Sequence, residues 1–437
     1  MIQRFNKQLN NKLINYRRDF HKYAEVKWTE FRTASLVAKE LVNMGYKIKL
    51  GEDMFVKGVQ ISYPSEQIIQ QNIKRAIEQG GDSDLIKQMQ GLPGVVAELD
   101  TDKQGPVIAM RFDIDALEMQ EVHKKGHYPY DNGFASVNKG FCHSCGHDAH
   151  TAIGLGVAEI VMQVKQKLTG KIKLIFQPAE EGGGGAIGIV NKGILDDVNY
   201  FFAPHMGLIK PNGKPLLSHG IICGVNDFLD VRRINAEYQG QSAHSCGDPH
   251  NGKNALLAAC NATINIHAIA PHSEGMLRVN VGMLAGGVSR NTIAPNANLI
   301  IEVRGEYKTV ADYGEKRVNA VLNSAATMYD VEVSINKIGS TCSAKSDNEA
   351  RKLVFEIAND IAWFTEYYDL GSVGGSDDAS EMISKVQSNG GLATYIGVGA
   401  DIAAGYHNEL FDFDENAMLP AVELFIKLIL KIQKDNI

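Results

Sequence analysis

The sequence predicts an α/β protein of two domains: a larger domain with a mixed sheet and, inserted into it, a ferredoxin-like (βαββαβ) α+β domain. Three observations lead to this prediction. Short apolar runs are separated by helical patterns, and ligand-type side chains follow the ends of several of these runs. In the middle of the chain the pattern changes to β-α-β-β-α-β, and α/β material returns after it. The first two features are typical of a sheet whose site lies beyond the carboxyl ends of its strands, and the third is typical of a split βαβ sandwich.

Length and composition limit the kind of protein. At roughly 150 residues per domain, 437 residues suggest about three domains, or two of which one is large. With 44% hydrophobic and 22% charged residues, the chain is neither disordered nor collagen-like. A formal charge of −7 gives no general attraction to nucleic acid or to anionic lipid. No apolar stretch approaches the roughly 20 residues that span a bilayer.

The N-terminal residues carry no apolar core of a secretory signal, so we expect a cytoplasmic protein. Its six cysteines are then expected to be thiols.

Helices and strands of the larger domain are predicted from the spacing of apolar residues and from glycines that end them. Apolar residues recur at three- and four-residue spacing over 11–45, which predicts a helix that ends at Gly45. A polar stretch over 65–90 predicts further helix in an exposed insertion. Apolar runs predict four strands: Val107–Phe112, Lys171–Phe176, Tyr200–Ala203 and Thr394–Val398. A long amphipathic helix is predicted from about Glu415.

The inserted domain follows from six consecutive elements. Its predicted strands and helices are Phe228–Tyr238, Ala255–Ile269, Leu277–Leu284, Asn298–Tyr307, Val310–Met328 and Val331–Ile338. We therefore expect residues 1–222 and 339–437 to form the larger domain and residues 223–338 to form the inserted one.

The densest group of reactive side chains is the run from Cys142 to His150, with three imidazoles, two thiols and a carboxylate. A structural zinc knuckle on Cys142-x-x-Cys145 would need a second ligand pair of similar spacing, and the chain has no other Cys-x-x-Cys. A redox Cys-x-x-Cys is the other alternative. An open catalytic metal site is favoured because further His and Glu candidates follow strands downstream.

Glu180 and Glu181 follow a strand and precede four glycines. Two adjacent glutamates are more often a solvated loop pair. Metal-assisted hydrolysis, however, needs one carboxylate to hold the ion and a second to accept a proton from water. His205 and His407 each follow an apolar run, and either alone is an ordinary histidine. With Cys145, His147 and Glu181 they make five ligands, enough for two ions of zinc, manganese or cobalt.

Three residues of the inserted domain are weaker candidates. His244 lies in Gln241-Ser242-Ala243-His244-Ser245 after the first strand, and a plain loop histidine is an equal alternative. Asn280 and Arg304 lie on predicted strands. Arginine binds carboxylates in a bidentate manner, although a strand arginine is usually only solvated.

The ordered motifs resemble the amidohydrolase branch of the co-catalytic metallopeptidase/aminoacylase superfamily, which includes hippurate and indole-acetyl-amino-acid hydrolases. The resemblance covers nearly the whole chain. Its motifs are Asp113-x-Asp115-Ala116-Leu117, His143-Ser144-Cys145-Gly146-His147-Asp148-x-His150-Thr151, Gln177-Pro178-Ala179-Glu180-Glu181-Gly182, His205 and His407-Asn408-Glu409.

The resemblance implies a two-domain metallohydrolase whose inserted domain serves as a dimerisation or lid domain, and it implies roles for individual residues. Two divalent ions, Mn²⁺ or Zn²⁺ with Co²⁺ possible, would be held by Cys145, His147, Glu181, His205 and His407. Glu180 would be the general base, and Asp115 would orient a ligand. His244 is similar to a family histidine that reaches across a dimer to polarise the scissile carbonyl. Asn280 and Arg304 would bind the substrate.

Two departures from the family pattern stand out. Cys142 and Ser144 replace apolar or small residues, and the first of them adds an oxidisable thiol near the ions. Ser245-Cys246-Gly247 replaces a more typical Ala-Gly run after His244, which weakens the role assigned to His244.

Further motifs are similar to a narrower group of this branch, the A-subunit family of p-aminobenzoyl-glutamate hydrolases. They include Tyr16-Arg17-Arg18-Asp19-Phe20-His21, Trp28-x-Glu30-Phe31-Arg32-Thr33-Ala34 and Phe411-Asp412-Phe413-Asp414-Glu415. This resemblance implies cleavage of p-aminobenzoyl-glutamate to p-aminobenzoate and glutamate. It also implies a homodimer, or a heteromer with a sister subunit, formed through the inserted domain. The alternatives are a hippurate-type or other N-acyl-amino-acid hydrolase, and a weakly active or non-catalytic subunit.

Overall fold

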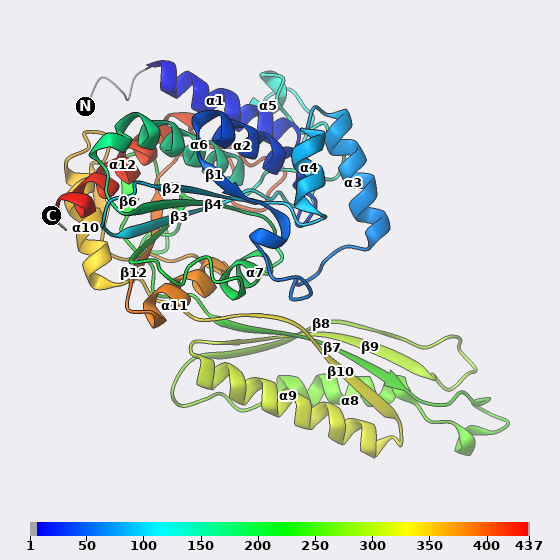
Figure 1. Cartoon of the computed structure of the whole chain (residues 1–437). Helices are drawn as coiled ribbons and strands as arrows, with labels where there is room; N and C mark the ends of the chain where they lie inside the picture. The colour runs from blue at the N-terminus through cyan, green and yellow to red at the C-terminus, as the bar shows by residue number, and fades with distance from the viewer. Residues whose placement is uncertain (1–6, 436–437) are drawn as a thin grey trace. The chain divides into compact units, whose positions relative to one another are not determined.

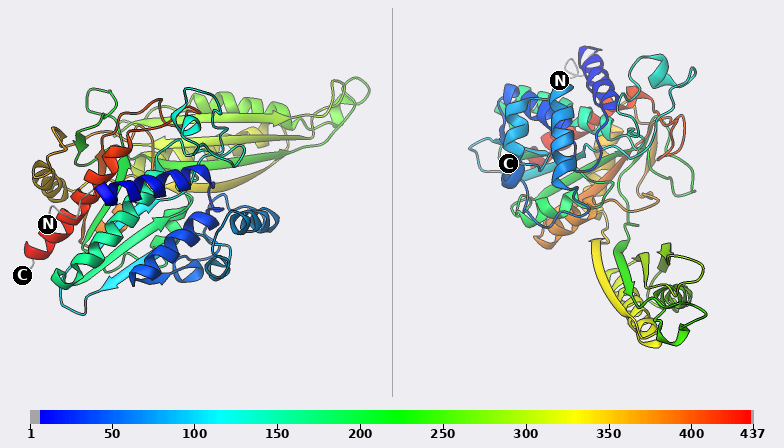
Figure 2. Two further views of the ribbon diagram at one scale, coloured as in Figure 1. Left: turned by 90° about the horizontal axis from the view of Figure 1, so that it is seen from above. Right: turned by 90° about the vertical axis from the view of Figure 1, so that its right-hand side faces the viewer.

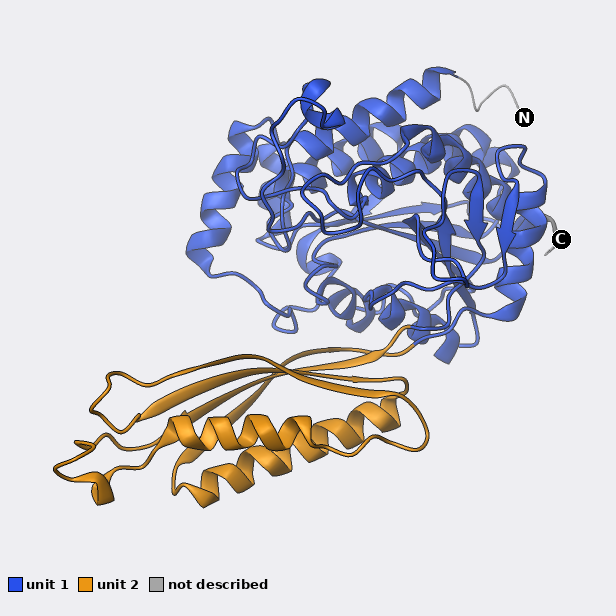
Figure 3. Ribbon diagram, turned by 180° about the vertical axis from the view of Figure 1, so that it is seen from behind, with its two compact units in different colours: residues 1–227, 344–437 blue, residues 228–343 orange. Residues whose placement is uncertain are grey.

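The computed structural model describes residues 7–435, and the chain divides into two compact units (Figure 3). Unit 1 comprises residues 1–227 and 344–437, and unit 2 comprises residues 228–343. The sequence placed these boundaries five residues earlier, after 222 and after 338. The shift has a local cause. Val225 forms a β-bridge with Gly371 of unit 1, and the last strand of unit 2 continues to Thr341.

Unit 1 contains an eight-stranded mixed sheet in the order β1-β2-β4-β3-β5-β12-β6-β11. Its central strands β4, β3, β5 and β12 are parallel, whereas β1, β2 and β6 each have an antiparallel neighbour. The strands are β1 (Lys47–Lys49), β2 (Val95–Asp100), β3 (Val107–Asp113), β4 (Lys171–Gln177), β5 (Tyr200–Met206), β6 (Gly220–Ile222), β11 (Glu366–Tyr368) and β12 (Leu392–Val398).

All four predicted strands of unit 1 are present, and β5 is longer than expected. We predicted that it ends at Ala203, with Pro204 and His205 in the following loop. Instead β5 continues through both residues because Pro204 and His205 pair in register with Ile396 and Gly397 of β12. Strands β1, β2, β6 and β11 were not predicted.

Helices cover both faces of the unit 1 sheet, with α1, α2, α6 and α12 on one face and α7 and α11 on the other (Figure 1). The helix α6, which was not predicted, packs on β3 and between α1 and α12. The helices are α1 (Lys7–Lys22), α2 (Phe31–Met44), α3 (Glu66–Glu78), α4 (Ser83–Met89), α5 (Tyr128–Asp131), α6 (His147–Val164), α7 (Gly185–Asn191), α10 (Asn348–Asn359), α11 (Ala379–Ser388) and α12 (Met418–Asp435).

The single helix predicted over 11–45 is wrong, because two helices, α1 and α2, share this segment. The chain turns between them at Trp28, whose φ of 63° lies in the left-handed region that no helix interior uses. Glu25 then accepts hydrogen bonds from the N–H groups of Arg32 and Thr33 at the start of α2. The predicted end at Gly45 is confirmed, since Gly45 has φ 95° and its N–H bonds back to the last turn.

The polar stretch over 65–90 forms two helices, α3 and α4. Asp82 caps α4 by accepting the N–H groups of Asp84 and Leu85. The stretch is not wholly exposed, because Ile69, Ala76 and other apolar side chains are buried in the core of unit 1.

Unit 2 has the predicted β-α-β-β-α-β order. Its antiparallel sheet has the order β10-β7-β9-β8, and α8 and α9 lie together on one face of it (Figure 2). A separate apolar core fills the space between this sheet and the two helices. The elements are β7 (Asp230–Gln239), α8 (Ala255–His267), β8 (Leu277–Gly286), β9 (Asn296–Gly305), α9 (Lys308–Met328) and β10 (Glu332–Thr341).

Across residues 7–435, none of the helices has the length and apolar character needed to cross a membrane.

Candidate metal centre

Four chain segments bring the predicted ligands of unit 1 together. Because β3, β4 and β5 are parallel neighbours, their carboxyl ends meet at one edge of the sheet. The loop after β4 carries Glu180 and Glu181, and β5 carries His205 close to its end. Helix α6 starts at His147, and Cys145 lies just before it. His407 comes from the long loop after β12.

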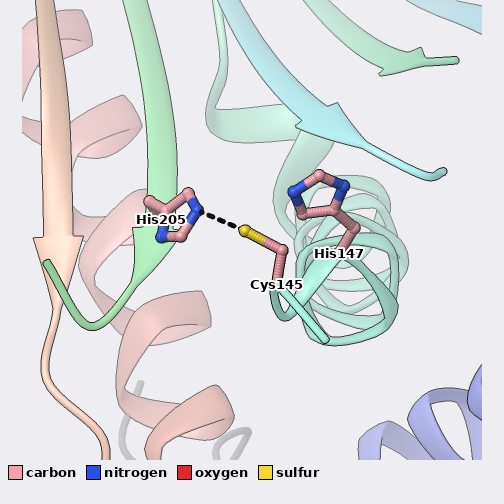
Figure 4. Close-up of side chains that lie close together, drawn as sticks. All are labelled: Cys145, His147 and His205. Atoms are coloured by element: carbon pink, nitrogen blue, oxygen red, sulfur yellow. Dashed lines mark hydrogen bonds between the residues drawn. The ribbon is translucent and has the colours of Figure 1, made fainter. Parts of the chain in front are cut away.

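Cys145, His147 and His205 form the first group of ligand atoms, all within 4.8 Å of one another (Figure 4). The Cys145 Sγ lies 3.5 Å from Nε2 of His205. Nδ1 of His205 faces the carbonyl oxygen of Met206 at 2.9 Å, so Nδ1 carries the proton and donates it. The Nε2 lone pair of His205 is therefore directed into the group, as a metal ligand requires.

Glu181 and His407 form a second group with Cys145, again within 4.8 Å. Nε2 of His407 lies 3.4 Å from Oε1 of Glu181. Nε2 of His147 lies 3.9 Å from the same oxygen and 4.0 Å from Oε2 of Glu180. The five predicted ligands and the predicted base therefore come from distant parts of the sequence to one place, and Cys145 belongs to both groups.

Asp115 supports this arrangement through two of its neighbours. Its backbone oxygen and Oδ1 face Nδ1 of His147 at 3.0 and 3.2 Å, which directs Nε2 of His147 toward the glutamates. Its Oδ2 accepts the N–H of Glu181 at 3.0 Å. The buried Asp115 thus orients one candidate ligand and fixes the backbone of another.

Asp378 forms hydrogen bonds at both ends of the loop after β4 that carries Glu180 and Glu181, which is called the glutamate loop from here on. One oxygen of Asp378 accepts the side-chain amide of Gln177 at 2.7 Å, and the other accepts the N–H of Ala186 at 2.9 Å. Between these points the loop folds back so tightly that a Cβ on Gly185 would lie 1.8 Å from the carbonyl oxygen of Pro178. Only glycine fits there.

The loop that carries His407 is attached to β5 through Tyr406. The Tyr406 hydroxyl donates to the carbonyl oxygen of Met206 at 2.7 Å and accepts the N–H of Leu208 at 3.0 Å. The same hydroxyl leaves no room for a side chain on Gly207, where a Cβ would lie 1.8 Å away. Tyr406 therefore ties the loop to the strand that carries His205.

The chemistry of these residues fits divalent cations. Burial lowers the pKa of His205 to about 3, which keeps its ring neutral and able to donate a lone pair. Burial lowers the pKa of His147, but the charge of Asp113 outweighs it and raises that pKa well above the usual range; the same carboxylate would also favour a metal cation bound nearby. Among the described residues, no donor hydrogen-bonds to the buried Oε1 of Glu181.

Glu180 differs from the ligands in its surroundings. Burial and the negative charges of Asp377 and Glu181 raise the pKa of Glu180 well above its usual range. A glutamate of raised pKa can carry a proton between two reacting groups, as a general base and acid must.

Two neighbouring residues are excluded as ligands by their surroundings. His150 belongs to a geometric group with Asp113 and His147, but Nδ1 of His150 bonds to Asp113 and its Nε2 accepts the N–H of Met206 at 2.9 Å. Both ring nitrogens of His150 therefore have hydrogen-bond partners already, and neither is free to bind a metal ion. Cys142 is completely buried and is part of no ligand group among residues 7–435. This argues against a zinc knuckle on the two cysteines.

Sequence reasoning missed a buried charged cluster beside Glu180. Arg111 bonds to Asp113, Gln177 and Asp377, and the Tyr395 hydroxyl donates to Asp377. Asp113 was noticed only as part of a motif, although its position at the end of a strand beside Asp115 was a usable signal. Asp377 and Asp378 follow no apolar run, so only the folded chain reveals them.

The three candidates of unit 2 are described within that unit alone. His244 is exposed in its loop, and its Nδ1 accepts the N–H groups of Cys246 and Gly247 at 3.2 and 2.9 Å. In the neutral ring the proton must then lie on Nε2, which leaves a free donor on that nitrogen for a further partner. Arg304 donates to Glu302 at 2.6 Å, and Asn280 pairs with Glu302 across the strands.

Two further arginines that the sequence reasoning missed share the sheet face of Arg304. Directly opposed residues of antiparallel strands point to the same face. Arg278 is opposite Arg304, and Arg233 is opposite Glu302. The face therefore carries more positive charge than Arg304 alone would give.

Comparisons with known proteins show which proteins this chain resembles. The chain is 42% identical to the A subunit of p-aminobenzoyl-glutamate hydrolase from Escherichia coli (strain K12), with 98% of each chain covered. It is 41% identical to indole-3-acetyl-aspartic acid hydrolase of Enterobacter agglomerans, with 97% of this chain and 96% of the relative covered. The crystal structure of an aminobenzoyl-glutamate utilization protein from Klebsiella pneumoniae superposes with a TM-score of 0.81 at 35% identity, covering 97% of this chain and 96% of the other.

A family profile also matches most of the chain. The profile of peptidase family M20/M25/M40 matches residues 109–431, a range that includes every predicted ligand and the inserted unit. With relatives of more than 40% identity over nearly the full length, the chain belongs to peptidase family M20/M25/M40, a family of hydrolases.

Proposed function

We propose that this protein hydrolyses the amide of an N-aroyl amino acid, with p-aminobenzoyl-glutamate as the substrate and p-aminobenzoate and glutamate as the products. The observation that carries the proposal is the convergence of Cys145, His147, Glu181, His205 and His407 around Glu180. The substrate is taken from the relative of 42% identity, which is named for p-aminobenzoyl-glutamate.

We assign the metal centre to two divalent ions, Mn²⁺ or Zn²⁺ with Co²⁺ as a further candidate. Cys145, His147 and His205 would hold one ion, and Cys145, Glu181 and His407 the other. Mixed imidazole, thiolate and carboxylate ligands suit these metals better than calcium or magnesium. When bound, such ions polarise a carbonyl oxygen and lower the pKa of a water molecule.

In this mechanism one side chain transfers the proton and others hold the reacting groups in position. Glu180 accepts a proton from the attacking water and returns it to the nitrogen of the leaving amino acid. Its raised pKa is consistent with holding that proton between the two steps. Asp115 keeps His147 and the backbone of Glu181 in position while the charge near them changes.

Unit 2 would supply groups that touch the substrate. We assign to Nε2–H of His244 the polarisation of the scissile carbonyl in a partner chain, because its other nitrogen is occupied by backbone donors. Asn280 and Arg304 would bind the carboxylate of the amino acid. The protein would then act as a homodimer or as a heteromer with a sister subunit, in the cytoplasm, where its six free cysteines remain thiols.

A second substrate is favoured by one specific observation. The relative of 41% identity is named for indole-3-acetyl-aspartic acid, which is also an amide of a dicarboxylic amino acid. The choice between the two substrates depends on the acyl group and on the length of the amino-acid side chain.

A substrate panel tests the proposal. The metal-loaded protein is incubated separately with p-aminobenzoyl-glutamate, indole-3-acetyl-aspartate and hippurate, and the released amine is measured. We expect the highest kcat/KM with p-aminobenzoyl-glutamate. Faster cleavage of either other amide would replace the proposed substrate. If none is cleaved by the isolated chain, the panel is repeated with a sister subunit, which distinguishes a chain that needs its partner from an inactive one.

A further inference from the structure

We infer that Glu30 is a positioning residue for Glu180, because it holds the peptide N–H that precedes Glu180 and so sets the direction of the Glu180 carboxylate. No motif of the predicted site includes this role, and Glu30 lies far from the glutamate loop in the sequence. The inference rests on the proposed function of Glu180 as the base.

The contact itself is short and completely buried. Oε1 of Glu30 accepts the N–H of Ala179 at 2.7 Å, and both residues have no exposed surface. Ala179 has a φ of 57°, in the left-handed region that a residue with a Cβ occupies only at a cost of roughly 1–2 kcal/mol. Such a conformation persists only where neighbouring groups fix it. The carboxyl group of Glu30, which accepts the N–H of Ala179, is such a group.

Glu30 works together with Asp115 on the two sides of Glu180. Asp115 accepts the N–H of Glu181, and Glu30 accepts the N–H of Ala179. The backbone before and after Glu180 is therefore bound on each side by a buried carboxyl group. Two fixed points on either side of a residue determine where its Cα–Cβ bond points, and hence where its carboxylate can reach.

The turn between α1 and α2 is built so that Glu30 is available for this contact. Glu30 occupies the cap position of α2, yet its side chain makes no cap hydrogen bond. Glu25 performs that task instead by accepting the N–H groups of Arg32 and Thr33. The backbone of Glu25 also accepts the N–H of Ala116, next to Asp115. The turn is thus anchored to the segment after β3 that carries Asp115.

The second oxygen of Glu30 makes no contact with the described residues that would require a negative charge. Within the described part of the chain, the buried Oε2 has no hydrogen-bond partner. Burial, and then the negative charge of Asp115, raise the pKa of Glu30 well above its usual range. A neutral carboxyl group has the same shape as an amide, so glutamine can replace it and still accept the N–H of Ala179.

Glu25 provides a matched control. Both side chains are fully buried carboxyl groups of the same turn, but the carboxyl group of Glu25 bonds to α2 rather than to the glutamate loop. The variants Glu30→Ala, Glu30→Gln and Glu25→Ala are compared with the wild type as metal-loaded full-length protein. Metal content, kcat, KM and thermal midpoint are measured for each.

We expect Glu30→Ala to lower kcat by about 10- to 100-fold, the usual range for a group that orients a functional residue, with KM and metal content unchanged. Glu30→Gln should recover most of that loss. Glu25→Ala should lower the thermal midpoint and leave kcat unchanged below it. Unchanged kcat in Glu30→Ala, or an equal loss of kcat in folded Glu25→Ala, would overturn the inference.

Amide hydrogen exchange gives a result that does not depend on turnover. Glu30→Ala should accelerate exchange at residues 179–181, whereas Glu25→Ala should accelerate it at 31–33. If the wild type cleaves no amide but this pattern is found, the proposed function fails and the positioning contact stands. If exchange at 179–181 is unaffected by Glu30→Ala, the contact does not hold the loop and the inference is wrong.

Discussion

The backbone N–H of His407 donates a 2.9 Å hydrogen bond to the carbonyl oxygen of Ser144. This bond joins the loop after β12 to the residue just before Cys145, and His407 adopts a φ of 56° to make it. The side chain of His407 is 52% exposed, whereas those of His147 and Glu181 are 2% and 13% exposed. His407 is therefore held through its backbone, and among these three its ring is the most accessible to water.

This difference predicts which ion is lost first. His407→Ala should reduce the metal content from two ions to about one per chain, because the group formed by Cys145, His147 and His205 does not include His407. Metal content after dialysis, measured by elemental analysis, checks this. The exposed His250→Ala serves as the control and should retain both ions. Loss of both ions from His407→Ala would show that the two groups bind as one.

Glu180→Gln should separate metal binding from catalysis. Glutamine keeps the size of the side chain but cannot accept a proton from water, so turnover should fall by about 10²- to 10⁴-fold. Metal content should be unchanged, since Glu181 is the glutamate that lies beside both histidines. Steady-state kinetics and elemental analysis on the same sample check both statements. A variant with wild-type activity would exclude Glu180 as the base.

The position of His244 can be tested by mixing two inactive variants. His244→Ala should abolish most turnover and retain metal, because His244 lies in unit 2 and no ligand group of the described residues includes it. If His244 acts in the partner's site, a mixed dimer of His244→Ala and Glu180→Gln contains one intact site. Random exchange should then restore about one quarter of wild-type activity. No recovery after verified exchange would place His244 in its own chain's site or outside any site.

The sequence predicted unit 2 element by element because its apolar periodicities are local. Among the candidate ligands of unit 1, residue type and position near the end of an apolar run gave a usable signal for residues such as His205 and Glu181, which the fold brings into candidate metal groups. The prediction failed between α1 and α2, where the helical pattern continues across the turn at Trp28 and only the backbone conformation shows the break. Asp378 and Glu30 were not predicted either, because their partners, Ala186 and Ala179, become neighbours only after the chain has folded.

Arg17 is predicted to be essential for stability. Its guanidinium has no exposed surface and bonds to Asp148, Asp412 and Glu415 at 2.8, 2.6 and 3.1 Å. Arg17→Met would remove the buried cation that these carboxylates share, although Asp148 keeps His21 and Glu415 keeps Arg18. Breaking a buried ion pair typically costs about 3–5 kcal/mol in the free energy of unfolding. Urea denaturation measures the change. Lys74→Met removes the exposed pair with Glu78 and should cost less than about 0.5 kcal/mol. Similar losses in both variants would contradict a special role for the buried cluster.

His21 gives the cluster around Arg17 a defined pH dependence. Burial lowers the pKa of His21, but its hydrogen bonds to Asp148 and Glu121 outweigh burial and raise the pKa from 6.5 to about 9. Because the folded pKa is higher than the unfolded one, the protonated ring stabilises the fold fully below about pH 6.5, and the contribution is lost as the pH rises through about 9.

Comparison with a neutral substitute isolates this contribution. The difference in the free energy of unfolding between wild type and His21→Gln should be largest at about pH 6 and should shrink steadily toward about pH 9.5. Urea denaturation of the metal-free protein at several pH values measures it, and His250→Gln, at a side chain that is 78% exposed, should show no such trend. A difference that stays constant over this range would mean that His21 carries no extra proton in the folded protein. A neutral ring has a single N–H, so it could donate to only one of the two carboxylates, Asp148 or Glu121.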